Sequence, residues 1–110
     1  MVQAKSELFE KSLTESANLF KALSHPARLQ ILIFIAESES CITGDISDEL
    51  PLGRTTVNQH IKELKEVGLI EGEIAGVKTK YCLNVKKIDE LKLTSLAFFD
   101  QLNTKNYKCK

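Results

Sequence analysis

One short stretch of the chain carries a cluster of side chains with the chemistry to read DNA bases. These side chains are Arg54, Thr55, Thr56, Asn58, Gln59 and Lys62. In the major groove Asn and Gln match adenine, and Arg matches guanine. A solvated surface helix can have the same composition, because polar side chains are well hydrated there. The elements around the stretch must therefore decide between the two interpretations.

The three cysteines form a second reactive group, and three interpretations stay open for them. Cys41, Cys82 and Cys109 would supply the three thiolates that As(III) needs, whereas Zn or Cd needs three or four N, S or O ligands. Their spacing matches no metal motif. They can instead act as a thiol redox sensor, with a Cys41 to Cys109 site or disulfide if the tail folds back in a dimer. Without either role, Cys41 and Cys82 are small buried side chains and Cys109 is incidental.

The base-reading cluster lies on a predicted helix over 54–67, with Gly53 as its N-cap and Gly68 as its C-cap. Its buried side is predicted from helical spacing to consist of Val57, Ile61 and Leu64. A short helix is expected over 44–50, with Thr43 as its N-cap. Two helices joined by a short turn that contains glycine are typical of a helix-turn-helix.

Two further helices are predicted before this region. The first spans about 6–23, and the second spans about 27–37. Ser24 is expected to cap the second helix, and Pro26 suits its first turn because the missing N–H is not needed there. The second helix is apolar nearly all round and is expected to be the central core helix. Its buried residues are predicted to be Leu29, Leu32, Ile33 and Ala36.

Beyond the helix-turn-helix the apolar period changes from 3.6 to 2, which predicts two strands, 69–74 and 78–83. Lys78, Lys80 and Cys82 alternate onto one face of the second strand. A hairpin directly behind a recognition-type helix is a wing, and the two lysines would meet phosphate while the helix lies in the groove.

The first and last helices, about 6–23 and 86–103, carry more apolar side chains than a surface helix needs. Exposed apolar patches of this kind usually mark an interface. The simplest arrangement that covers both is a symmetric homodimer, which also presents two recognition helices to a two-fold operator. The predicted fold is therefore mainly α with a two-stranded wing, in the order α-α-α-α-β-β-α, and dimeric through the terminal helices.

Length and charge place limits on this interpretation. A chain of 110 residues supports one domain, with the helix-turn-helix at 43–67, the wing at 69–84 and a tail at 104–110. Residues 1–50 carry four Lys or Arg against eight Asp or Glu, and residues 86–110 carry six against three, within a net charge of zero. Any DNA affinity must therefore come from a few well-placed contacts and from dimerisation.

The chain lacks the roughly 20 consecutive apolar residues that a bilayer requires. Its first residues also carry no hydrophobic secretion segment. No membrane partner is expected, and the protein is predicted to be cytoplasmic. Because such a compartment is reducing, an odd set of three cysteines disfavours a structural disulfide framework.

Three segments resemble the ArsR/SmtB repressors, a family of dimeric winged-helix proteins that leave DNA when an inducer binds. They are 23–32 (Leu-Ser-His-Pro-Ala-Arg-Leu-Gln-Ile-Leu), 44–46 (Gly-Asp-Ile) and 55–64 with Gly68-Leu69-Ile70. The resemblance implies that Arg54, Thr55, Asn58 and Gln59 face the major groove of an imperfect palindrome. It also implies that His60 either approaches the DNA backbone or packs inside, and that His25 is structural.

The family's usual metal sites are incomplete in this chain. Its thiolate motif has two cysteines, where this chain has Cys41 alone, and its other common site needs histidines in the last helix, where this chain has none. As(III), Cd, Zn or an oxidant as inducer, and a regulator without metal sensing, all stay open. A winged helix used as a protein-interaction module is a further alternative. An enzyme is not expected, because no catalytic set is present in the sequence.

Overall fold

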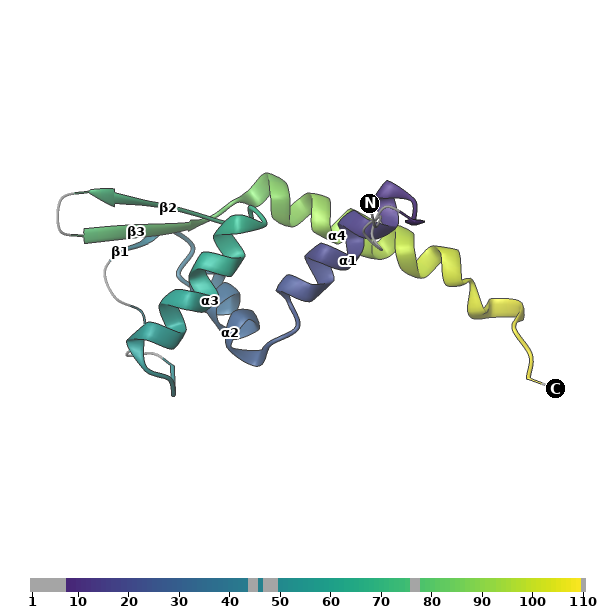
Figure 1. The fold of residues 1–110 in the computed structure, drawn as a ribbon, viewed down its shortest axis with the longest axis horizontal. Coiled ribbons are helices and arrows are strands. Elements are labelled where there is room, and N and C mark those ends of the chain that lie inside the picture. Colours follow the sequence, from purple (N-terminus) through teal and green to yellow (C-terminus); the bar gives the residue numbers. More distant parts are fainter. Residues whose placement is uncertain (1–7, 44–45, 47–49, 76–77, 110) are drawn as a thin grey trace, which may run out of the picture.

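The helix-turn-helix region and the hairpin lie at one end of an elongated molecule, and the first and last helices cross beyond them (Figure 1). The computed structural model describes residues 8–43, 46, 50–75 and 78–109, without the side chains of residues 43, 73–75, 78 and 79. Its principal extents are 57 × 42 × 26 Å.

The elements follow the predicted winged-helix order. They are α1 (Lys11–Ala22), α2 (Pro26–Glu37), β1 (Ile42–Thr43), α3 (Arg54–Glu66), β2 (Ile70–Ala75), β3 (Lys78–Leu83), α4 (Val85–Leu102) and the 3₁₀ helix η3 (Thr104–Asn106). The fold class is confirmed. The short helix expected over 44–50 lies almost entirely outside the described residues, although Ile46 within it is buried in the core.

The core is built around the inner face of α3. Val57, Ile61 and Leu64 are 0%, 3% and 0% exposed, as the helical spacing predicts. They pack with Ile31 and Ile35 of α2 in one cluster that also contains Leu69, Ile70 and Leu91. Each such buried aliphatic side chain contributes about 1.5–3 kcal/mol relative to an exposed one, so this face holds α3 in place.

The buried face of α2 differs from the expected one. Ala27, Ile31 and Ile35 are buried, whereas Leu29 and Ile33 are 44% and 48% exposed. Ala36 is also exposed, and of the four predicted core residues Leu32 alone is partly buried. The physical reason is that α2 is apolar nearly all round, so periodicity selects no face and packing against α3 does.

The start of α2 also differs in detail. His25, and not Ser24, is the N-cap: its Nδ1 accepts a hydrogen bond from the Ala27 N–H at 3.0 Å. The Ser24 hydroxyl instead donates to the carbonyl of Lys21 in α1 at 2.6 Å. Pro26 occupies the first turn as predicted, where its missing N–H costs nothing.

Both glycine caps of α3 are confirmed. Gly53 is its N-cap, and Gly68 follows its last turn with φ +83°. The Gly68 N–H donates to the Lys65 carbonyl and the Leu69 N–H donates to the Leu64 carbonyl, both at 3.0 Å. This double closure requires the left-handed conformation that glycine adopts without a Cβ penalty, and it turns the chain directly into the wing.

The wing is a three-stranded antiparallel sheet with β3 in its centre. The predicted hairpin is present, and its register pairs Ile70 with Leu83 and Gly72 with Tyr81. The short strand β1 was not predicted; it pairs Ile42 with Tyr81 on the other side of β3. Two residues are too few to show an alternating pattern, so this strand is visible only in the fold.

α1 and α4 pack against each other through an edge-to-face contact between Phe20 and Phe98, whose ring centroids lie 5.8 Å apart. α4 is capped by Asn84, whose Oδ1 accepts from the Lys87 N–H at 3.2 Å. Large apolar side chains of this region are nevertheless well exposed: Leu8, Phe9, Leu13, Leu93, Leu96, Phe99 and Leu102.

No single helix in the described part of the chain is long and apolar enough to cross a membrane. Helices α1 and α2 reach the required length and composition only when taken together, and they are bent by 84° relative to each other.

Candidate nucleic-acid interface

The outer face of α3 gathers the predicted base-reading side chains. All six are exposed: Arg54, Thr55, Thr56, Asn58, Gln59 and Lys62. By helical spacing, Thr55, Asn58, Gln59 and Lys62 lie away from the core residues, whereas Arg54 and Thr56 flank them in the first turn. The Gln59 side-chain amide donates to the Glu63 carboxylate at 3.0 Å. That bond is exposed and therefore weak in net terms, so Gln59 can exchange it for a base edge at little cost.

The start of α3 adds backbone donors to this face. Gly53 has no side chain with which to cap the helix, and its carbonyl accepts from the Val57 N–H. The first-turn N–H groups of a helix have no intrahelical partner and favour anions such as phosphate. The N-terminal turn of α3 thus offers backbone donors that suit a phosphate group.

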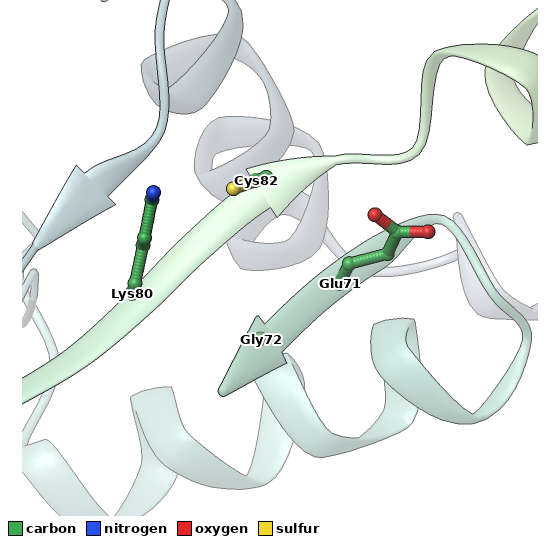
Figure 2. A pocket seen from close by; sticks show the side chains of 4 residues that line it. All are labelled: Glu71, Gly72, Lys80 and Cys82. Atoms are coloured by element: carbon green, nitrogen blue, oxygen red, sulfur yellow. The ribbon is translucent and has the colours of Figure 1, made fainter. Parts of the chain in front are cut away.

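Strand β3, which carries Lys80, lies at the same end of the molecule as α3 (Figure 1). Lys80 is exposed in the middle of β3, opposite Thr43 of β1 and Glu73 of β2. Figure 2 shows it beside a hollow that Glu71, Gly72 and Cys82 also line. The side chain of Lys78, the other predicted wing contact, lies outside the described residues.

Two of the three cysteines are joined. Cys41 and Cys82 form a disulfide, with their Cα atoms 4.3 Å apart. The cause is the unpredicted strand: because Ile42 pairs with Tyr81, the preceding Cys41 lies opposite Cys82 across the β1 and β3 ladder. The expectation of no structural disulfide, and the interpretation of both residues as unpaired fillers, are therefore wrong for this structure. The separation of 41 residues gave no sequence signal for the pair.

The cysteines do not converge on a metal site. Cys109 is free and exposed in the tail that follows α4, and Figure 1 places this tail at the end of the molecule away from the sheet. Among the described residues no group of three or more His, Cys, Asp or Glu side chains could hold a metal ion. With the Cys41 and Cys82 sulfurs bonded to each other, the residues present do not fit a three-thiolate site.

Among the predicted DNA-contact residues whose side chains the structure describes, His60 alone faces inward. Its side chain is 8% exposed, and its Nδ1 accepts a hydrogen bond from Arg28 Nε at 3.1 Å. Of its two interpretations, the packed one fits this geometry. The pKa of His60 lies below its ordinary value of 6.5. Burial is the main cause, and His25 and the Arg28 guanidinium add to it, whereas Glu63 opposes the shift without reversing it. Sequence reasoning did not single out Arg28, although it lies in the helix-start segment with His25.

Comparison with known proteins extends this picture. Residues 23–73 match a family described as a helix-turn-helix domain. The chain is 37% identical over 65 residues to the biofilm growth-associated repressor of Xylella fastidiosa, and this match covers 59% of the chain and 56% of that protein. It is 32% identical over 85 residues to MJ1325, an uncharacterized HTH-type transcriptional regulator of Methanocaldococcus jannaschii, and this match covers 77% of the chain and 91% of that protein. The chain is also 31% identical over 85 residues to the HTH-type transcriptional repressor SmtB of Mycobacterium tuberculosis, a match that covers 77% of this chain and 62% of that protein. The chain belongs to the ArsR/SmtB family.

This ArsR/SmtB chain spans only about half the length of the Xylella repressor. Its fold matches the solution structure of the homodimeric winged helix-turn-helix DNA-binding domain of Mb0332 from Mycobacterium bovis, a possible ArsR-family transcriptional regulator. The TM-score is 0.61 at 20% identity, and the match covers 99% of both chains. At this identity the likeness shows the fold alone.

Proposed function

We propose that the protein is a sequence-specific DNA-binding transcriptional repressor that acts as a homodimer on an imperfect palindrome. The observation that carries the proposal is the exposed polar face of α3, which presents Arg54, Asn58 and Gln59 on a helix held rigidly by its buried side. The family relationship supports it, since the Xylella fastidiosa relative is named a repressor. Such a protein works where its operator is, which supports a cytoplasmic location.

The contacts divide into two classes. Arg54, Asn58 and Gln59 read base edges in the major groove. Thr55 faces the major groove beside them. Thr56 and Lys62 on α3, together with Lys78 and Lys80 on the wing, contact phosphates and set the register without reading sequence. His60 acts from inside the domain, because its buried side chain cannot reach the backbone of DNA.

The dimer forms through the terminal helices, 6–23 and 86–103. Leu13, Leu96 and Phe99 are 41%, 55% and 63% exposed in the single chain, and a symmetric contact between two copies of this face would remove them from water. Two-fold symmetry then sets the two α3 helices to half-sites about one turn of DNA apart, or roughly 34 Å.

The inducer is an oxidant in this proposal. The bond between Cys41 and Cys82 ties the residue before β1 to the wing strand that carries Lys80, so its formation changes how the wing is held relative to the segment that leads into α3. Two thiols lose two electrons and two protons, and a hydroperoxide accepts them to become an alcohol and water. The reduced repressor binds its operator, and the oxidised one releases it.

Two alternatives remain distinct outcomes. As(III), Cd or Zn as inducer requires reduced thiols, and titration of the reduced protein with each would then give thiolate charge-transfer absorption and loss of DNA binding. A protein-interaction module requires aromatic or aliphatic anchors on the outer face of α3. The exposed residues of α3 are polar instead, as Arg54, Asn58 and Gln59 illustrate.

The decisive experiment measures affinity for DNA from the protein's own upstream region by fluorescence anisotropy. Asn58→Ala and Gln59→Ala should each weaken binding to the cognate palindrome by about 1–3 kcal/mol. Lys80→Ala should weaken binding to all sequences alike and reduce the salt dependence, whereas Lys105→Ala in the tail serves as a matched control and should change nothing. Unchanged affinity in all three interface variants would refute the proposal, and equal affinity of reduced and oxidised protein would refute the redox part alone.

A further inference from the structure

A partly buried contact behind the recognition face joins three helices through one arginine. Arg28 of α2 donates from Nε to His60 Nδ1 of α3 at 3.1 Å and from Nη1 to the carbonyl of Ala22, the last residue of α1, at 3.3 Å. His60 is the one buried polar residue in the described part of the chain. The pair therefore ties the middle of the recognition helix to the corner between the dimerisation helix and the core.

The hydrogen bond from Arg28 determines where the proton of His60 lies. A guanidinium only donates, so Nδ1 must be an acceptor and the imidazole must be neutral with its proton on Nε2. His60 Nε2 is buried and has no partner among the described residues. The site is thus built around one tautomer and one charge state of His60.

A second proton has no favourable place to go. It would have to sit on Nδ1, where it would displace the Arg28 hydrogen bond and face the guanidinium charge. The other titratable groups that act on His60 are His25, whose ring centroid is 4.3 Å away, and Glu63 one turn along α3. Glu63 would favour protonation, but its carboxylate accepts a hydrogen bond from Gln59.

We propose that Arg28 and His60 form a pH-sensitive latch that positions the recognition helix against the corner between α1 and α2. Near neutral pH the latch is closed. When the pH falls below the pKa of His60, its imidazole takes up a proton and the latch opens, while Val57, Ile61 and Leu64 still hold α3 in the core. Opening the latch changes the orientation of the polar face of α3 relative to α1, the dimerisation helix. The operator affinity and the free energy of unfolding both fall as a result. Only the fall in operator affinity depends on the proposed function.

The matched variants follow from the chemistry of the two histidines. His60→Asn keeps an acceptor at the position of Nδ1 but cannot be protonated, so it should keep the latch closed at every pH. His25→Asn removes the neighbouring imidazole but keeps a favourable N-cap for α2. The pKa of His60 in the folded protein lies below 6.5, so the unfolded chain binds more protons as the pH falls. The free energy of unfolding therefore decreases as the pH falls below 6.5.

The first measurement is an imidazole ¹⁵N NMR titration of the wild-type protein. We expect the Nε2–H tautomer of His60 at pH 7.5 and a titration midpoint below 6.5. The opposite tautomer, or a midpoint at or above that value, would overturn the latch. This measurement does not depend on any variant or on DNA.

The second measurement follows the urea midpoint and the operator affinity from pH 7.5 down through the His60 midpoint that the NMR titration gives. Both should fall in the wild-type protein and in His25→Asn, and both should stay nearly level in His60→Asn. The latch is wrong if His60→Asn responds like the wild type, or if His25→Asn alone abolishes the response. Should His60→Asn fail to fold, the NMR titration decides. Absence of operator binding at every pH would count against the proposed function. The latch would then be judged by the tautomer of His60 and by its NMR titration midpoint.

Discussion

The disulfide between Cys41 and Cys82 should be a large part of the protein's stability in its oxidised form. The perturbation is the double substitution Cys41→Ser/Cys82→Ser, or reduction of the wild type. Cross-linking removes loop-closure entropy from the unfolded chain, roughly as 2.1 + 1.5R ln n cal/mol/K for a loop of n residues. For the separation of 41 residues this corresponds to about 4 kcal/mol at 25 °C.

The size of the domain converts this free energy into a temperature. A change of 1 kcal/mol moves the melting temperature by roughly 4 °C for a domain of about this length. The oxidised wild type should therefore melt roughly 15 °C above the double variant. The assay is differential scanning calorimetry with and without a phosphine reductant, at one fixed protein concentration because dimerisation also shifts the midpoint.

Cys109→Ser is the matched control. Cys109 is exposed and free, so this variant should melt like the wild type in both redox states. The double variant should be insensitive to the reductant. A wild type that melts at the same temperature before and after verified reduction would refute the reasoning, because the cross-link would then be absent or without effect on the unfolded chain.

Two further predictions concern the caps and the dimer. Gly68→Ala should destabilise the protein by about 1–2 kcal/mol, because a Cβ is unfavourable at φ +83°. Gly53→Ser should stabilise it by roughly a few tenths of a kcal/mol through N-capping. Urea unfolding measures both, and equal effects of the two changes would contradict the cap assignment. Phe99→Glu should convert the homodimer to a monomer in analytical ultracentrifugation, because it places a charge on the exposed apolar face of α4, while Asp100→Asn beside it should leave the dimer intact; a dimeric Phe99→Glu protein would exclude this face.

The recognition helix could be predicted from sequence because its determinants are local. The spacing of Val57, Ile61 and Leu64 specifies which side is buried. Asn58, Gln59 and Lys62 lie off that side and are exposed. Gly53 and Gly68 mark its ends for equally local reasons, since only nearby backbone hydrogen bonds are involved. The hairpin followed from its alternating pattern in the same way.

Three features were decided only by the tertiary structure. The buried face of α2 depends on what packs against it, because a helix that is apolar all round has no intrinsic inner side. The pairing of Cys41 with Cys82 depends on β1, a two-residue strand that exists only by pairing with β3. The hydrogen-bond partner of His60 is Arg28, which approaches it from a helix 32 residues earlier. Local periodicity thus determined the elements and the recognition face, whereas contacts between residues distant in sequence decided the disulfide and the partner of the buried histidine.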